Sequence, residues 1–123
     1  MVIDSSIFIE HLRAKNKNQT QLYQIPNDTE IFISTITLYE LLMGATTGNK
    51  RTDIDNLTHG IPILSFNEEI ALKAAEIYHQ LRLENKMIEF RDIFIGATCL
   101  INDLSLKTLN KKHFDRIKGL RIE

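Results

Sequence analysis

Apolar residues in this chain form short runs without alternation, separated by longer segments in which apolar positions recur at helical spacing. Short unalternating runs are typical of strands buried in a parallel sheet. Pro62 lies within the third run, and because proline cannot donate to a strand ladder, that run is predicted to be an edge strand. The predicted strands are residues 1–4, 31–33, 60–64, 104–108 and 119–122.

The segments between these runs predict helices. Ser5 and Ser6 are predicted to cap the first helix, Ser34 and Thr35 the second, and Asn67 begins the longest. Strands that alternate with helices predict a single α/β domain over residues 1–123, a three-layer α/β/α fold with a short-stranded parallel sheet. The predicted helices are residues 7–12, 21–25, 36–45, 50–57, 67–83, 93–101 and 110–116, and residues 15–19 are predicted to form a loop.

Residues 93–101 are apolar or small at nearly every position. A helix without a polar face is packed on all sides, and this one is too short to cross a membrane, which takes about 20 apolar residues. Cys99 lies inside it and is expected to be a small core residue. Asp92 stands at its start, where an aspartate is a favoured helix cap.

Composition narrows the classes of function. Apolar residues make up 43% and charged residues 25%, and the net charge of −1 gives no global basic field, so nucleic-acid binding requires a local patch. One cysteine excludes an internal disulfide and a cysteine-based zinc site. The opening Met-Val-Ile-Asp lacks the features of a signal peptide, so a cytoplasmic protein without membrane association is expected.

Several oxygen-bearing side chains are expected at the carboxyl edge of the sheet, where ligands bind in such folds. Asp4 ends the first strand, Glu40 lies on the second helix, Asp92 heads the apolar helix and Asn110 follows the fourth strand. Each also has a purely structural interpretation: a cap for Asp92, a strand-end turn for Asp4 and a snorkelling side chain for Glu40. Glu40, however, has apolar neighbours and no basic residue nearby in the sequence, so a cation is expected beside it.

Carboxylates without cysteine or a histidine pair indicate a hard ion, Mg²⁺ or Mn²⁺, rather than zinc. The four histidines are scattered singly and are interpreted as surface or structural residues. Acidic clusters that bind Mg²⁺ mostly serve phosphoryl chemistry.

The chain resembles the PIN-domain endoribonucleases, in particular the toxins of VapBC-type toxin–antitoxin pairs. The resemblance rests on four motifs in order: Val2-Ile3-Asp4-Ser5-Ser6, Tyr39-Glu40-Leu41-Leu42-Met43-Gly44-Ala45, Asp92-Ile93-Phe94-Ile95-Gly96-Ala97 and Thr108-Leu109-Asn110-Lys111-Lys112-His113-Phe114. Each motif is weak alone, but together they are fairly specific and span nearly the whole chain.

This resemblance implies a PIN-like fold in which Asp4, Glu40 and Asp92 are the metal-binding, catalytic acids of a Mg²⁺- or Mn²⁺-dependent endoribonuclease. The family's fourth acid is replaced by Asn110, which leaves a second metal site in doubt. Ser6 and Thr108 match polar positions that border the family's site, although a helix cap and a strand end explain them equally well. The resemblance further implies a cognate antitoxin and a homodimer. The stripe over residues 70–81 is either the interface of that homodimer or part of the core.

Basic residues suggest where RNA would bind. Lys111, Lys112 and Arg116 belong to a basic C-terminal segment that is either a phosphate-binding rim or solvated surface. Arg82 matches a common basic position of these toxins, with a solvated helix face as the alternative. No interleaved aromatic residues indicate base stacking, so the sequence does not identify the RNA target.

Two other classes remain open. A phosphoacceptor receiver domain has a similar length, fold and Mg²⁺ requirement, but it needs an acid after the third strand, where this chain has Leu64-Ser65-Phe66-Asn67. A non-catalytic RNA- or protein-binding module on the same fold is the stronger alternative, since the fourth acid is missing.

Overall fold

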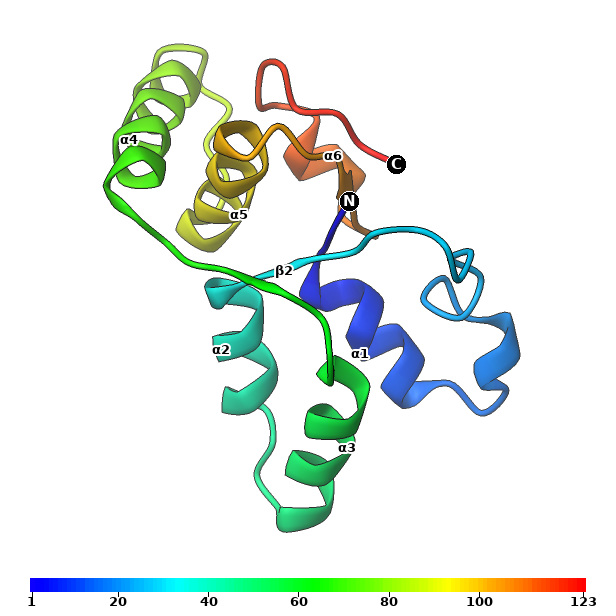
Figure 1. The fold of residues 1–123 in the computed structure, drawn as a ribbon. Coiled ribbons are helices and arrows are strands. Elements are labelled where there is room, and N and C mark those ends of the chain that lie inside the picture. Colours follow the sequence, from blue (N-terminus) through cyan, green and yellow to red (C-terminus); the bar gives the residue numbers. More distant parts are fainter.

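The computed structural model describes all residues, 1–123, and places four short parallel strands between two layers of helices (Figure 1). Strand β1 (Val2–Ile3) pairs with β4 (Leu106–Lys107), and β2 (Ile33–Ser34) pairs with β3 (Ile63–Leu64). A bridge between Val2 and Phe32 joins the two pairs, so the order across the sheet is β3, β2, β1, β4. The predicted parallel sheet and the edge position of the third strand are confirmed.

The fifth predicted strand is present only as a single bridge between Ile122 and Leu106. The Leu106 N–H donates to Arg121 O, and the Glu123 N–H donates to Leu106 O. These two hydrogen bonds form one bridge only, so the ladder is too short to count as a strand.

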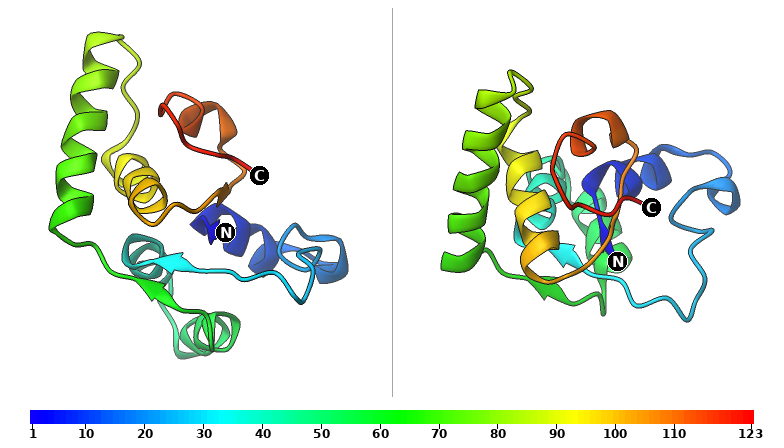
Figure 2. Two further views of the ribbon diagram at one scale, coloured as in Figure 1. Left: turned by 45° about the horizontal axis from the view of Figure 1, so that its top comes forward. Right: turned by 90° about the horizontal axis from the view of Figure 1, so that it is seen from above.

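The helices divide between the two faces of the sheet. One face carries α1 (Ser5–Arg13), α2 (Thr35–Met43) and α3 (Gly48–Thr58). The other carries α4 (Glu68–Leu83), α5 (Phe90–Ile101) and α6 (Lys111–Phe114), with α4 and α5 side by side in both views of Figure 2. None of these helices is long and apolar enough to span a membrane.

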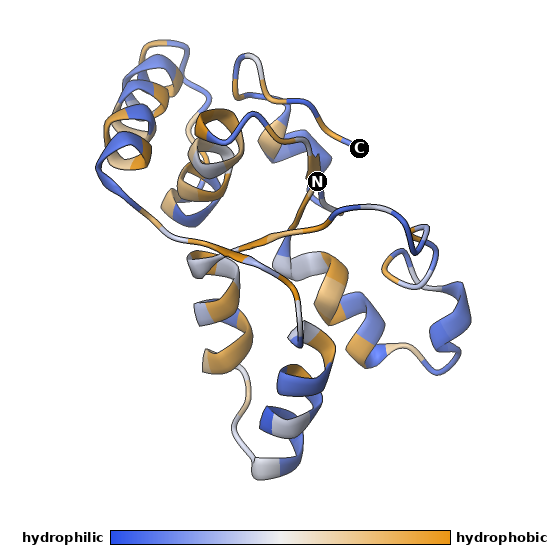
Figure 3. Cartoon of the chain, in the orientation of Figure 1, coloured by the Kyte–Doolittle hydropathy of each residue, from blue (hydrophilic) through white to orange (hydrophobic).

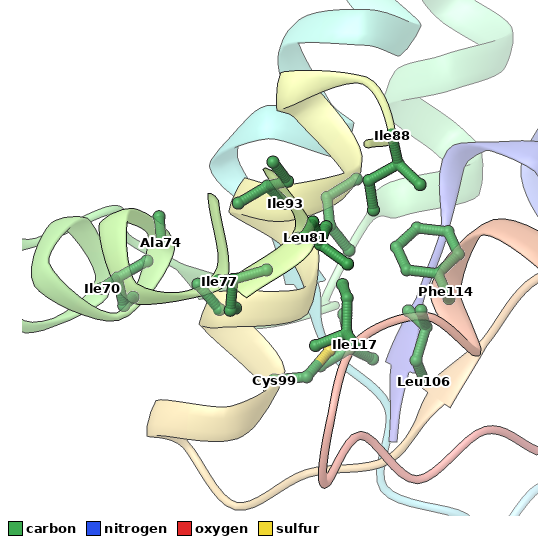
Figure 4. Close-up of a cluster of buried hydrophobic side chains, with 13 residues drawn as sticks. Ile70, Ala74, Ile77, Leu81, Ile88, Ile93, Cys99, Leu106, Phe114 and Ile117 are labelled. Atoms are coloured by element: carbon green, nitrogen blue, oxygen red, sulfur yellow. The ribbon is translucent and has the colours of Figure 1, made fainter. Parts of the chain in front are cut away.

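Successive residues of β1 pack into different cores, because side chains alternate between the faces of a strand. Val2 belongs to a cluster of 13 buried residues, built mainly from α4, α5 and the C-terminal segment (Figure 4). Ile3 belongs to a cluster of six, which also includes Ile33 and residues of α1, α2 and α3. Figure 3 shows the crossing segments that carry β2 and β3 largely in orange, between these two cores.

The larger core contains both the stripe of α4, whose burial the sequence left open, and Cys99. The stripe of α4, from Ile70 to Leu81, is packed inside it and is therefore core rather than an exposed interface. Cys99 is a free, fully buried thiol, as predicted, and burial raises its pKa to about 12.

Several predicted helix starts are confirmed by their capping bonds. The Ser34 hydroxyl accepts from the Thr37 N–H at 3.0 Å, and the Asn67 side chain accepts from the Ile70 N–H at 2.9 Å. Ser5 and Ser6, in contrast, lie inside α1, because Asp4 already occupies the cap position with an extended backbone.

Two local predictions between residues 15 and 25 need correction. Residues 21–25 form turns, because their backbone bonds mix one helical bond, Gln24 N–H to Thr20 O, with a tighter one, Ile25 N–H to Leu22 O. The predicted loop contains a short 3₁₀ helix, η1 (Lys17–Gln19). Its Asn16 cap accepts from the Asn18 N–H.

Gly96 allows the C-terminal segment to close onto α5, one turn after Asp92. A Cβ at this position would lie 2.5 Å from the Ile117 Cδ1. Ile117 is 3% exposed and packed in the larger core, so its side chain has little room to move away.

Gly96→Ala is therefore expected to lower the free energy of unfolding by about 1 kcal/mol, because overpacking costs about 1–3 kcal/mol and the helix gains about 1 kcal/mol. Ile117→Val removes the clashing methyl and should cost about 0.5–1.5 kcal/mol alone. In the double variant the two losses should be less than additive, as measured by urea unfolding. Fully additive losses would show that the two positions do not clash.

Candidate active site

Asp4 is held at the carboxyl end of β1 by two hydroxyl groups. Its side chain is buried, and its Oδ2 accepts from Ser6 Oγ at 2.8 Å and from Thr108 Oγ1 at 2.7 Å. No hydrogen bond reaches its Oδ1, and the carboxylate does not cap α1. The strand-end position therefore presents one free carboxylate oxygen in a fixed orientation.

Ser6 and Thr108 also fix the loop after β4. Leu109 N–H donates to Ser6 Oγ at 3.1 Å, and Asn110 N–H donates to Thr108 Oγ1 at 3.0 Å. The two hydroxyl oxygens are 3.4 Å apart. Both residues thus lie beside Asp4, and their hydrogen bonds connect α1 to the β4–α6 loop.

Asp92 is the third residue of α5 and is not its cap, because Glu89 occupies that position. The capping interpretation was wrong for that reason. Asp92 is 3% exposed and its carboxylate accepts no hydrogen bond; His113 Nδ1 lies 3.6 Å from it and Arg91 Nε 3.9 Å. Burial and the negative charge of Asp4 raise the pKa of Asp92 to about 6.

Glu40 reaches toward the site from α2, with a side chain that is only 9% exposed. Its Oε1 accepts from Ser5 Oγ at 3.3 Å, and its Oε2 accepts from Arg91 Nη1. The expectation that no basic residue lies beside Glu40 holds only along the sequence, because folding brings Arg91 of α5 next to α2.

Sequence reasoning missed Arg91, Ser5 and Glu89 as members of this cluster. Arg91 also pairs with Glu89, with its Nε 2.9 Å from Glu89 Oε2. One signal for it was available: a cation in the first turn of a helix opposes the helix dipole, so another interaction must hold it there. His113, interpreted as a surface or structural residue, is half exposed but lies against Asp92.

The remaining residues predicted to border the site or to bind RNA lie in different places. Asn110 precedes α6 and lines, with Leu109, Lys111, Lys112 and His113, a cavity of about 380 Å³. Arg116 instead donates to the backbone oxygens of Lys86 and Met87, and so ties down the loop between α4 and α5.

Arg82 is also used within the protein. It donates to Tyr78 Oη at 3.1 Å on the surface of α4, and it contacts none of the acids. The side chains of Lys111 and Lys112 thus have no ion-pair or hydrogen-bond partner and line the cavity beside His113, whereas Arg82 and Arg116 have internal partners.

The arrangement combines two buried, interacting carboxylates with a third that is paired to an arginine. No three acidic, histidine or cysteine side chains lie close enough together to bind one ion as they stand. The chemistry of the donors nevertheless fits a hard divalent ion, because Asp4 and Asp92 offer carboxylate oxygens that no hydrogen bond occupies. Glu40 would join them only after releasing Arg91.

Comparisons with known proteins agree with this geometry. The PIN domain family matches residues 1–120. Ribonuclease VapC1 of Rickettsia felis is 33% identical over 129 residues, covering 99% of this chain and 93% of that protein. Ribonuclease VapC1 of Methanocaldococcus jannaschii is 28% identical over 124 residues, covering 99% and 85%.

Solved structures show the same fold. VapBC-1 from nontypeable Haemophilus influenzae superposes with a TM-score of 0.82 at 27% identity, covering 99% of this chain and 95% of the matched chain. A toxin–antitoxin complex from Klebsiella pneumoniae gives 0.75 at 26% identity, covering 97% and 93%. With this match over nearly its full length, the chain belongs to the PIN domain family and, within it, to the VapC ribonucleases.

Proposed function

We propose that this chain is a metal-dependent endoribonuclease and the toxin of a VapBC-type toxin–antitoxin pair. The observation that carries the proposal is the pairing of two buried carboxylates, in which the negative charge of Asp4 raises the pKa of Asp92. A divalent cation bound between the two carboxylates would offset this repulsion. The names of the ribonucleases that it resembles support the same reaction.

Asp4 and Asp92 would hold Mg²⁺ or Mn²⁺, with Glu40 as a third ligand or a partner of its bound waters. The ion supplies a water activated for attack and offsets the charge that develops on the phosphate. Ser6 and Thr108 keep Asp4 oriented through Oδ2. Asp92, with its free carboxylate at the site, takes the proton of the attacking water.

Lys111 and Lys112 are proposed to bind the RNA backbone. They line the cavity beside His113, which itself lies against Asp92, so phosphates bound there would lead the strand into the site. Asn110 stands in the same cavity and offers an amide where the family's fourth acid is expected. An amide can orient a bound water without adding a negative charge.

The partners follow from the same comparison. Matched structures are described as VapBC and toxin–antitoxin complexes, which supports an antitoxin partner. We propose that this antitoxin binds over the acidic crevice and that the pair acts in the cytoplasm. For a homodimer, the buried residues Ile70, Ile77 and Leu81 of the α4 stripe are not available. We propose instead the wholly apolar pocket of about 480 Å³ between α4 and α5, which is lined by Phe66, Ala71, Ala74, Ala75, Tyr78, Phe90, Ile93 and Phe94.

The second candidate function is a catalytically weak RNA- or protein-binding module on the PIN fold. Two observations favour it: Asn110 replaces the fourth acid, and Glu40 is occupied by Arg91. Metal-dependent cleavage separates the two functions. The nuclease requires it, and the binding module does not show it.

The proposed function is tested by cleavage of a mixed RNA substrate. Mg²⁺ or Mn²⁺ should support cleavage, excess EDTA should abolish it, and Asp4→Asn should remove it because the site loses a metal-binding carboxylate. Circular dichroism of Asp4→Asn controls for folding. Full cleavage in excess EDTA would contradict metal dependence, and no cleavage with any divalent ion would favour the binding module.

Asp92→Asn should change how the stability of the metal-free protein depends on pH. The pKa of Asp92 is raised from 3.8 to about 6 in the folded state, so its stabilising contribution is fully present below about pH 4 and is lost as the pH rises through 6. In EDTA the variant should match the wild type near pH 4. Near pH 7.5 it should be more stable by roughly 1–3 kcal/mol in urea unfolding. A difference that does not vary with pH would contradict the raised pKa.

Replacing Lys111 and Lys112 by alanine should weaken RNA binding across sequences. The slope of log affinity against log salt concentration should fall by about 1.4, since each lost contact to single-stranded RNA contributes about 0.7. Arg82→Ala is the matched control, because Arg82 is engaged by Tyr78, and it should leave the slope unchanged. An unaltered slope in the lysine variant would show that these residues are only solvated surface.

A further inference from the structure

Arg91 is surrounded by three carboxylates, one from α2 and two from the start of its own helix, α5. Its Nη1 donates to Glu40 of α2, its Nε lies 2.9 Å from Glu89, and the same Nε is 3.9 Å from Asp92. The guanidinium therefore stands where the acids of the site converge. It is the only arginine or lysine that contacts any of the three acids proposed to hold the metal.

The position of Arg91 in α5 makes this contact more informative. Arg91 is the second residue of the helix, where the helix dipole disfavours a cation. The acids outweigh that penalty, above all Glu40, whose side chain is only 9% exposed and has no other charged partner. In the metal-free site, Arg91 thus supplies the positive charge that pairs with Glu40.

We propose that Arg91 is a positioning residue that competes with the divalent cation for Glu40 and, once displaced, binds the RNA phosphate. This inference rests on the proposed function of the site. In the metal-free protein the guanidinium holds the Glu40 carboxylate in place. When the ion takes Glu40, Arg91 gives up this carboxylate and turns toward the substrate.

The geometry of Arg91 suits such an exchange. Its side chain is 47% exposed, so it can leave Glu40 by rotating its own torsions without moving the core. Its planar guanidinium has five N–H donors, which match the oxygens of a phosphate group as well as those of a carboxylate. Glu89, which is 69% exposed, keeps the freed side chain beside the site.

The first test measures Mn²⁺ binding by calorimetry for the wild type, Arg91→Gln, Arg91→Lys and Arg51→Gln. Arg91→Gln should bind Mn²⁺ about tenfold more tightly, because a unit charge a few ångströms away no longer opposes the ion. Arg91→Lys keeps the charge and should stay near the wild type. Arg51, an exposed arginine paired with Asp55 on α3, is the matched control and should have no effect.

The second test separates competition from a merely structural role. In EDTA, Arg91→Gln should melt below the wild type, since Glu40 has lost its partner, whereas added Mn²⁺ should raise its melting temperature by more than it raises that of the wild type. In a Glu40→Gln background, Arg91→Gln should tighten Mn²⁺ binding less. A structural role alone would lower the melting temperature equally with and without Mn²⁺, and would overturn the proposal.

The phosphate contact has its own readout. With saturating Mn²⁺, Arg91→Gln should raise the KM for RNA several-fold, and Arg51→Gln should leave it unchanged; an unchanged KM in Arg91→Gln would overturn this part. Equal Mn²⁺ affinity in wild type and Arg91→Gln would overturn the competition and leave the nuclease function standing. If the wild type neither binds Mn²⁺ nor cleaves RNA, the proposed function fails, and the inference fails with it.

Discussion

The repulsion between carboxylates that are buried together at the carboxyl end of the sheet is the constraint on which the site depends. Asp4 and Asp92 lie within reach of one another's charge and are both almost fully buried, which raises the pKa of Asp92. Such an arrangement costs folding free energy in the absence of a cation. The surrounding fold offsets this cost with two hydroxyl donors to Asp4 and with Arg91 beside Glu40.

The two cores hold the acids against this repulsion. Asp4 is held in place because β1, which directly precedes it, packs into one core through Val2 and into the other through Ile3. Asp92 is fixed because α5 is packed on nearly all sides, and Gly96 lets the C-terminal segment approach it closely. The acids come from three separate elements, so the geometry of the site depends on the packing of both layers.

The basic residues around the site fall into two groups: Arg91, which contacts the acids, and Lys111 and Lys112, which line the neighbouring cavity. Arg91 neutralises part of the acidic cluster from within, whereas Lys111 and Lys112 have no partner and line a cavity with His113. Arg82 and Arg116 look similar in the sequence but are committed to Tyr78 and to the backbone after α4. A basic residue in the sequence therefore does not by itself identify an RNA-binding group; what matters is whether its side chain already has a partner within the protein.

The sequence determined the parallel α/β fold, the caps at Ser34 and Asn67 and the buried helix around Cys99, because these follow from local periodicity and strand order. That Ser6 and Thr108 border the site was indicated only by the resemblance to the PIN-domain ribonucleases. The sequence did not determine the partner of Glu40. Arg91 lies 51 positions away along the chain and meets Glu40 only because α2 and α5 pack together. Burial of Asp92, its place inside α5 rather than at its cap, and the internal use of Arg82 and Arg116 were likewise decided by tertiary packing, since solvent access and long-range contacts are properties of the assembled layers.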